Sequence, residues 1–503
     1  MNISVWIVGL AVPCLSFVLQ VWPRLINRYF GIDTWRHLMY ANYVRKHKKF
    51  PKEIRDKYLV VGPYGYPPVI IKILSFFPKS FNEKYQFIFS PVFDFLHNYF
   101  IFCAALMLTK DLTTAISAQI IAALTPLVVI EASNLNTRAI SYLIYSLSFF
   151  PLLLFIYTHS MLWLALAFIG LILLFYTHRF AVQAYIFCAI GLGIFERNPL
   201  YLIFFLTAFA TVYVLGGEFY KSILNEHLAL LNFWKKNIDF RFAHQFRGNV
   251  KPRLIKDFVF KIYNLSFKSP FIYIVGNNPW LGIYFLGFLL PYIYKSFPGI
   301  IIDVPMILKL NLWVIALLMS SILILSVKGL RFLGEGHRYL EYAVLPMSIV
   351  LGSYFSVLYG KYGGISLIVF ASLCCSLLVA IIFLQKKTIV ADRGRTIGSE
   401  LWEIINYLNK NIGKKVRLAV FPISLGDAMM YFLKGRVLTS DSIFGQMKLG
   451  ILPIIKEPFY NYVVKYNLNH VLIDQTYVSI NELKLKKITI VKNINNYTLL
   501  KVQ

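Results

Sequence analysis

Charged residues are scarce in this chain: only 15% of its 503 residues are Asp, Glu, Lys or Arg, while 58% are hydrophobic. Soluble domains carry about 25% charged residues. The apolar residues are gathered into long uncharged runs of the length that a helix needs to cross a lipid bilayer. The shortage of charge therefore excludes an ordinary soluble globule and indicates a polytopic membrane protein.

Cysteine is also rare, with five residues in the whole chain. Each of the five lies inside an apolar stretch, and their spacing matches no metal-ligand motif. This pattern excludes a disulfide framework and a cysteine zinc site. We expect the five to be small core residues: Cys14, Cys103, Cys188, Cys374 and Cys375.

Acidic residues are much less frequent than basic ones, 23 against 51, which gives a net charge of +28. So large an excess predicts an anionic partner. In a membrane protein an anionic lipid headgroup, an anionic glycan or a phosphate-bearing substrate is expected, and nucleic acid is not. We therefore expect the membrane itself and an anionic lipid or glycan among the partners.

Long apolar runs predict about eleven spans, and we read the first, residues 2–22, as a retained helix rather than a signal peptide because it has no basic start and no cleavage site. The other spans are expected at residues 86–108, 113–131, 139–157, 161–176, 180–195, 199–216, 271–294, 310–327, 339–359 and 365–384.

Two long polar segments interrupt the spans. Residues 24–85 hold amphipathic stretches separated by the turn-rich KYLVVGPYGYPP, and such helices are expected to lie in the membrane interface. Residues 217–270 form a second, basic loop. The predicted fold is therefore an α-helical polytopic membrane domain, residues 1–388, with a long loop after the first span and a small C-terminal soluble α/β domain, residues 389–503.

The orientation of the chain rests on conflicting signals. An odd number of spans places residues 24–85, residues 217–270 and the tail on one side, and these segments hold most of the basic residues. The positive-inside rule would place that side in the cytoplasm, although the rule weakens for long loops and domains.

Asp33 follows the first span, and His37 lies four residues later, on the same face of a helix. A carboxylate at the membrane surface is suited to act as a general base or to help hold a divalent ion. Asp is equally common as a helix N-cap, so the spacing alone leaves both roles open. No second acidic residue lies beside Asp33; a cofactor is therefore not identified, and a divalent metal is left open but not indicated.

The first loop has a fixed order of features: Asp33 after a short approach, a helix with His37-Leu38, a basic stretch ending in Phe50-Pro51, and then Tyr64-Gly65-Tyr66-Pro67-Pro68. With this order the loop resembles the first extracytoplasmic loop of GT-C class glycosyltransferases. The resemblance implies an integral membrane enzyme that moves a sugar from a polyprenyl-phosphate or polyprenyl-diphosphate donor, with Asp33 in the active site. His37, Tyr64 and Tyr66 are then expected to contact the sugar or the acceptor.

A second candidate cluster lies in RFLGEGHRYLEYAVLP, ahead of the tenth span. If a helix begins near His337, then His337, Arg338 and Glu341 share one face at the membrane boundary. Arg338 is the first choice to bind the donor phosphate, because a guanidinium gives bidentate and permanently charged hydrogen bonds. The alternative is a juxtamembrane arginine that merely reaches toward the headgroups.

His178 and Arg179 lie between two spans on the side predicted for Asp33, and they are further candidates for phosphate binding or for anchoring a turn. Asp94 and His97 fall at membrane depth, where ionisable groups are functional or internally paired. Packing partners are the simpler expectation for this pair.

Together these features predict a multi-pass cell-membrane glycosyltransferase of cell-envelope glycan biosynthesis, with an extracytoplasmic active site in which Asp33 takes the proton of an acceptor hydroxyl. Two alternatives remain. A transporter or flippase of an anionic lipid-linked glycan would also explain the basic loops, although no internal repeat is present. An O-antigen-type ligase or polymerase would use the same donor class.

Overall fold

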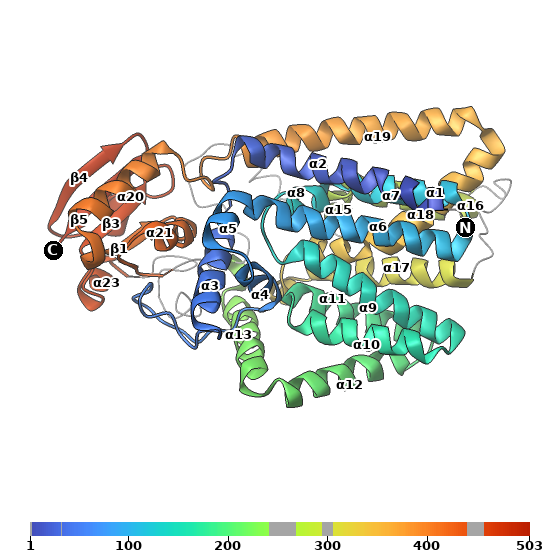
Figure 1. The fold of residues 1–503 in the computed structure, drawn as a ribbon, viewed down its shortest axis with the longest axis horizontal. Coiled ribbons are helices and arrows are strands. Elements are labelled where there is room, and N and C mark those ends of the chain that lie inside the picture. The colour runs from blue at the N-terminus through green and yellow to red at the C-terminus, as the bar shows by residue number, and fades with distance from the viewer. Residues whose placement is uncertain (1–2, 32, 241–267, 294–304, 440–456) are drawn as a thin grey trace.

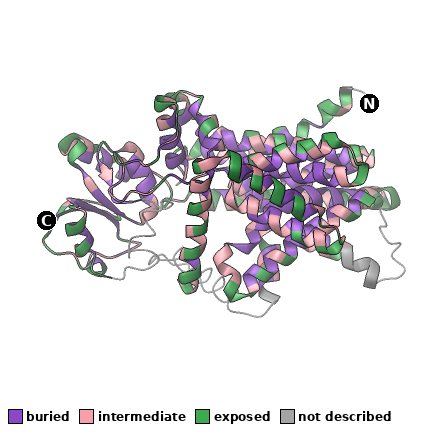
Figure 2. Cartoon of the chain, turned by 90° about the horizontal axis from the view of Figure 1, so that it is seen from below, coloured by how far each residue is buried: buried purple, intermediate pink, exposed green. Residues whose placement is uncertain are grey.

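The computed structural model describes residues 3–31, 33–240, 268–293, 305–439 and 457–503. A bundle of long helices occupies one end of an elongated molecule, and a small domain containing a sheet occupies the other (Figure 1). The loop after the first span lies between them. Buried residues fill the centre of the bundle and of the sheet domain, and exposed residues lie along the outer faces (Figure 2).

The bundle is built from apolar helices that run back and forth along the long axis, and the more polar α13 lies across that direction beside the loop (Figure 1). Their bounds are α1 (Ile3–Val8), α2 (Ala11–Ile26), α6 (Phe89–Thr109), α7 (Leu112–Ala123), α8 (Pro126–Ala132), α9 (Arg138–Thr158), α10 (Met161–Phe175), α11 (Arg179–Phe195), α12 (Leu200–Leu215), α13 (Gly217–Lys236), α15 (Lys268–Asn277), α16 (Pro279–Ile293), α17 (Pro305–Ser326), α18 (Val344–Tyr362) and α19 (Gly364–Gln385).

Within the described residues, seven helical segments are long and apolar enough to cross a membrane, and α7 with α8 would make an eighth. Helices α10 and α11 are apolar but shorter. The prediction of a polytopic helical membrane protein is confirmed, while the predicted number of spans stays a prediction.

Prolines break two of the predicted spans. Residues 113–131 were expected to form one span, but the chain bends by 62° between α7 and α8. Pro126 begins α8, and proline both lacks a backbone N–H and disfavours a helical conformation in the residue before it. Residues 271–294 are divided in the same way into α15 and α16, ahead of Pro279.

The loop between α2 and α6 contains α3 (Asp33–His47), α4 (Val69–Ser75) and α5 (Lys79–Tyr85). Residues 34–41 of α3 are all buried, because the helix is enclosed by the bundle, the rest of the loop and the C-terminal domain. The expectation that the helices of this loop lie in the membrane interface stays a prediction. The second predicted loop begins with α13, and its residues 241–267 lie outside the described residues.

The C-terminal domain contains a five-stranded sheet in the order β2-β1-β3-β5-β4. Strand β1 (Arg417–Phe421) pairs in parallel with β2 (Arg436–Val437) and β3 (His470–Asp474), and β5 (Tyr497–Val502) pairs antiparallel with β3 and with β4 (Ile488–Ile494). Helices α20 (Ser399–Asn411), α21 (Gly426–Phe432) and α23 (Tyr460–Lys465) complete it. The prediction of a small C-terminal α/β domain is confirmed, and its last two strands, β4 and β5, form an antiparallel pair.

Candidate active site

Asp33 is the first residue of α3, and a buried arginine fixes the chain that leads to it. The guanidinium of Arg24, at the end of α2, donates to the carbonyl oxygen of Phe30 at 2.8 Å and to the side chains of Gln86 and Asn134 at 3.0 Å each. Gly31 has a φ of +112°, and a Cβ there would lie 2.6 Å from the side chain of Asn134. The direction from which α3 starts is therefore set by contacts with α2 and with the turn before α9.

The carboxylate of Asp33 is half exposed, with 49% of its side chain accessible, and it accepts a hydrogen bond from Arg36 at 3.0 Å. Partial burial acts to raise the pKa of the Asp33 carboxyl, but the positive charges of Arg36, His37 and Arg138 and the hydrogen bond from Arg36 outweigh it, so this pKa lies below its ordinary value of 3.8. Asp33 is therefore an accessible anion at neutral pH.

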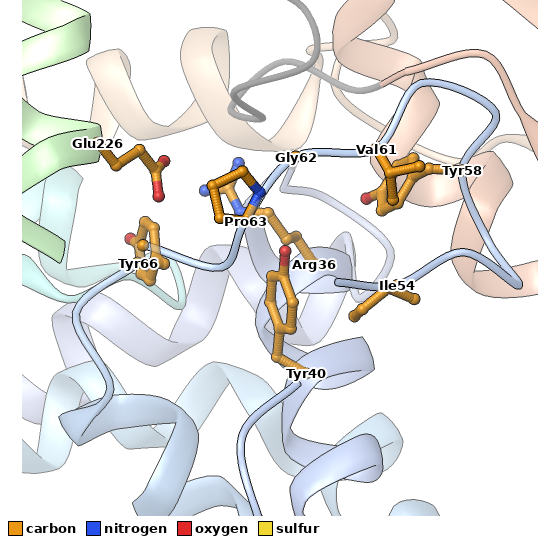
Figure 3. Close-up of a pocket in the computed structure, with 10 residues that line it drawn as sticks. Arg36, Tyr40, Ile54, Tyr58, Val61, Gly62, Pro63, Tyr66 and Glu226 are labelled. Atoms are coloured by element: carbon orange, nitrogen blue, oxygen red, sulfur yellow. The ribbon is translucent and has the colours of Figure 1, made fainter. Parts of the chain in front are cut away.

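Arg36 connects Asp33 to the rest of the protein. Its guanidinium is buried, lies 3.4 Å from the carboxylate of Asp427 on α21, and stacks 5.1 Å above the ring of Tyr66. Figure 3 shows Arg36, Tyr40, Tyr66 and Glu226 around a cavity that has about 390 Å³ of empty space, part of it continuous with solvent.

His37 is buried behind Asp33, and its Nε2 lies 3.2 Å from the hydroxyl of Tyr66. Burial, together with the positive charge of Arg36, lowers the pKa of His37 to about 3, so the ring is neutral in ordinary buffers. The hydroxyl of Tyr66 also lies 3.5 Å from that of Thr137, the residue before Arg138. His37 and Tyr66 thus link the Asp33 helix to the start of α9.

Arg179 holds the YGYPP segment against the bundle. It donates to the carbonyl oxygen of Gly65 at 2.8 Å and pairs with Glu226 of α13 at 3.1 Å. This geometry fits the predicted anchoring role of Arg179. Tyr64 is buried among aromatic rings, including those of Tyr40 and Phe219, so it packs the loop and does not reach the Asp33 carboxylate.

A second cluster of charges lies at the start of α9. Arg138 forms ion pairs with Glu131 at 2.7 Å and with Glu341 at 3.5 Å, and Glu341 accepts a hydrogen bond from Tyr142 at 2.6 Å. Arg338 is paired with Glu131 at 3.5 Å and with Glu335. Two guanidinium groups therefore share three carboxylates, and Arg338 is already engaged in this structure.

The segment that carries His337, Arg338 and Glu341 is not the expected α-helix. Residues Gly336–Ala343 form a 3-10 helix, and α18 begins only at Val344. Because a 3-10 helix has about three residues per turn, the α-helical spacing assumed for His337, Arg338 and Glu341 does not apply. His337 lies 3.9 Å from Glu335, and the partners of Glu341 come from α9 instead.

The structure brings most of the predicted site residues into one network. The hydroxyl of Tyr66, beside Arg36 and His37, contacts that of Thr137, which precedes Arg138 in the chain. The positive charge of Arg138 also helps to lower the pKa of Asp33. His178 enters the same network through Nδ1, which lies 2.9 Å from the hydroxyl of Tyr342.

Asp94 and His97 lie outside this network. Asp94 accepts hydrogen bonds from Gln20 and Ser16 of α2, and His97 lies 3.0 Å from Ser146 of α9. These contacts fit the expectation that neighbouring side chains satisfy the hydrogen-bonding groups of Asp94 and His97.

Two residues of the site have no signal in the sequence, because Arg24 and Asp427 act through contacts across more than one helix. Glu131 and Arg138 differ, since they flank the short EASNLNTR segment on the side predicted for Asp33. The sequence allows a contact of this pair with the sugar or the acceptor, and an ordinary loop pair is the simpler interpretation. Within the residues that the structure describes, no group of three or more His, Cys, Asp or Glu side chains is placed to hold a metal ion.

The fold is shared with solved membrane proteins of low sequence identity. One is ArnT from Cupriavidus metallidurans bound to undecaprenyl phosphate, with 12% identity, a TM-score of 0.55, and coverage of 99% of this chain and 98% of ArnT. The oligosaccharyltransferase of Archaeoglobus fulgidus in the apo form has 12% identity and a TM-score of 0.59, over 94% of this chain and 69% of that one.

A further structure of the Archaeoglobus fulgidus protein, AglB in complex with an inhibitory peptide and a dolichol-phosphate, has 10% identity and a TM-score of 0.54, over 94% of this chain and 69% of AglB. No protein-family model matches the sequence. No match is found among curated proteins. Over most of its length, this chain therefore shares the fold of ArnT and of the archaeal oligosaccharyltransferase.

Proposed function

We propose that this protein is a GT-C type glycosyltransferase that moves a sugar from a polyprenyl-phosphate or polyprenyl-diphosphate donor to the hydroxyl of an extracytoplasmic acceptor. The observation that carries the proposal is Asp33: an accessible, ionised carboxylate held by Arg36 beside the arginine cluster of Arg138 and Arg338. It lies in a chain with the fold of proteins whose structures contain undecaprenyl phosphate and dolichol-phosphate.

In the proposed reaction the acceptor oxygen attacks the anomeric carbon, and the bond from that carbon to the phosphate oxygen breaks with its electron pair. Attack from the face opposite the phosphate inverts the anomeric carbon. Asp33 takes the proton of the acceptor hydroxyl. A carboxylate with a lowered pKa is a weak base, so the transfer occurs late, when the forming bond has made the hydroxyl proton acidic.

Negative charge grows on the phosphate as it leaves, and a fixed guanidinium nearby stabilises that charge more than the ground state. Arg338 is our candidate for this role. Its side chain is 20% exposed and forms ion pairs with Glu131 and Glu335. The phosphate oxygens would take the place of one of these carboxylates, while Arg138 and His337 complete the surroundings.

The proposed acceptor is an anionic lipid or glycan, and the proposed site of reaction is the outer surface of the membrane. The surplus of 51 basic over 23 acidic residues supports an anionic partner. The inhibitory peptide in the AglB structure is bound by AglB, and we do not extend it to this chain.

Reconstitution in vesicles tests the proposal against a flippase. The purified protein is supplied with a panel of undecaprenyl-phosphate sugars carrying labelled sugar, together with an envelope lipid extract as acceptor. We expect label to leave the polyprenyl lipid and appear in the extract. Movement of intact labelled donor across the bilayer, with no loss of sugar from it, would overturn the proposal.

A further inference from the structure

A second cleft lies on the other side of α3 from the charge network, where the loop meets the C-terminal domain. Its volume is about 420 Å³, which is within the usual range of small-molecule sites, and it is open to solvent. Three parts of the chain build it: the segment after α2, helices α3 and α5, and helices α20 and α21. Figure 1 shows α3, α5 and α21 next to one another between the helix bundle and the sheet, with α20 farther toward the sheet.

Aromatic rings form the walls of this cleft. The ring centroid of Trp402 lies 5.5 Å from that of Tyr29 and 4.6 Å from that of Phe432, and Phe432 lies 4.8 Å from Trp35. Tyr29 is 45% exposed, whereas Trp35 is buried. Rigid aromatic rings with accessible faces suit the flat C–H faces of sugar rings, because they offer a large contact area at a small entropic cost.

Basic side chains supply the polar part of the cleft. Arg28 and Lys84 line it and are exposed, and among the described residues neither has a carboxylate within ion-pairing distance. The one carboxylate in the lining, that of Glu83, accepts a hydrogen bond from Tyr431 at 2.8 Å and lies 3.6 Å from Lys79. Among the described residues the cleft therefore offers an anionic group two cations that have no carboxylate partner, although the Nζ of Lys84 also lies 5.0 Å from the centroid of the Tyr85 ring.

The backbone of Arg28 is held by hydrogen bonds, and its side chain is exposed. Its carbonyl oxygen accepts hydrogen bonds from Gln86 at 3.0 Å and from Arg24 at 3.3 Å. In the sequence, Tyr29 precedes Asp33 by four residues and Trp35 follows it by two. The cleft thus opens beside the start of α3, the same helix end that presents the Asp33 carboxylate.

We infer that this cleft binds a saccharide bearing an anionic group, such as a phosphate or a carboxylate, as the part of the acceptor that extends beyond the reacting hydroxyl. The aromatic walls contact the sugar ring, and Arg28 and Lys84 contact the anion. This inference rests on the proposed function for its description of the occupant as an acceptor, while the binding itself is independent of catalysis.

Binding is tested on the full-length protein in nanodiscs of neutral lipid, with glucose 1-phosphate as the probe and saturation-transfer NMR as the readout. We expect contact of the sugar protons with the protein, and weaker binding of glucose or of inorganic phosphate. The double variant Arg28→Gln/Lys84→Gln should bind the probe about tenfold more weakly, because it loses charge-assisted hydrogen bonds. Trp402→Ala should lose the contact of the sugar protons.

Two controls make the result specific. Lys52→Gln/Lys410→Gln removes two exposed charges outside the cleft and should bind like the parent protein. Asp33→Asn should also bind normally, so a catalytically dead protein that still binds the probe separates this inference from the proposed function.

Equal binding by the parent protein and the Arg28→Gln/Lys84→Gln variant would overturn the inference. So would phosphatidylglycerol nanodiscs that abolish probe binding, since the cleft would then be a site for a phospholipid headgroup. A peptide that displaces the probe while glucose 1-phosphate shows no contact of its sugar protons would also contradict it. Because Arg28 and Lys84 are exposed, their replacement tests the cleft without disturbing the core.

Discussion

The guanidinium of Arg36, in the loop after the first span, lies 3.4 Å from the carboxylate of Asp427 in the C-terminal domain, and both side chains are buried. The same guanidinium donates to Asp33 at 3.0 Å. The C-terminal domain thus takes part in holding the proposed catalytic base, although its own residues do not enter the proposed reaction.

Replacing Asp427 should destabilise the protein. Asp427→Ala leaves the buried charge of Arg36 with only the half-exposed Asp33, and removing one partner of a buried ion pair costs about 3–5 kcal/mol. The matched control is Glu403→Gln, in an exposed pair with Lys492, where about 1 kcal/mol or less is expected. Thermal unfolding in detergent measures both variants. Equal melting temperatures would show that the Arg36–Asp427 pair contributes nothing.

Gly65 should not tolerate a side chain. A Cβ there would lie 2.3 Å from the Glu226 carboxylate and 2.8 Å from the carbonyl oxygen of Ser222. Gly65→Ala should therefore cost about 1–3 kcal/mol and reduce transfer by displacing Tyr66 from Arg36. Gly360→Ala, at a position with open space, is the control and should be close to neutral. Equal stability and activity of both variants would contradict the packing described for the YGYPP segment.

The pH–rate profile of sugar transfer should show no inflection from the titration of His37. Its pKa of about 3 keeps the ring neutral, and the lowered pKa of Asp33 keeps the carboxylate ionised until the pH falls below 3.8. As the pH falls, activity that depends on the Asp33 anion is therefore lost only in strong acid. The rate profile between about pH 5 and 8 tests this. An inflection near pH 6.5 that disappears in His37→Gln would contradict it.

Arg338 should act on the donor. Arg338→Gln removes the guanidinium, and we expect kcat/KM for the polyprenyl-phosphate sugar to fall by about 10- to 100-fold, the effect of one charge-assisted hydrogen bond or two. Arg338→Lys keeps the charge but loses the planar, two-pronged donor geometry, so its kcat/KM should lie between those of the parent protein and of Arg338→Gln. Arg197→Gln, an exposed arginine between α11 and α12, is the control. An unchanged kcat/KM in Arg338→Gln would remove Arg338 from the proposed mechanism.

The C-terminal domain is predicted to face the outside of the cell. A reporter fused after Gln503, active only outside the cytoplasm, should give signal. Its matched partner, a reporter active only in the cytoplasm, should remain silent. The opposite pattern would favour the positive-inside assignment of the basic loops and contradict the extracytoplasmic reaction.

Local sequence patterns identified much of the fold. Uncharged runs such as residues 365–384 predicted their helix almost to the residue, since α19 covers Gly364–Gln385. Breaks such as the one before Pro126 were missed, because a hydropathy window averages over a single proline. The buried environment of α3 was missed because it depends on a domain some 390 residues further along the chain.

The sequence predicted only those residues of the candidate site that lie close together along the chain. Asp33, His37 and the YGYPP segment lie in one loop, and their order in the sequence pointed to them. The partners that set their chemistry come from elsewhere: Asp427 from the C-terminal domain and Arg138 from α9. Such pairs have no spacing rule, since the fold alone brings them together.

The most direct test of the proposed function is the transfer rate of Asp33→Asn beside Asp56→Asn, which changes an exposed aspartate of the same loop. Both are measured with the polyprenyl-phosphate sugar that the parent protein uses, together with donor binding. Loss of a general base predicts a rate about 10²–10⁴ times lower for Asp33→Asn, with donor binding retained and Asp56→Asn unchanged. Transfer by Asp33→Asn at the parent rate would contradict the central role of Asp33.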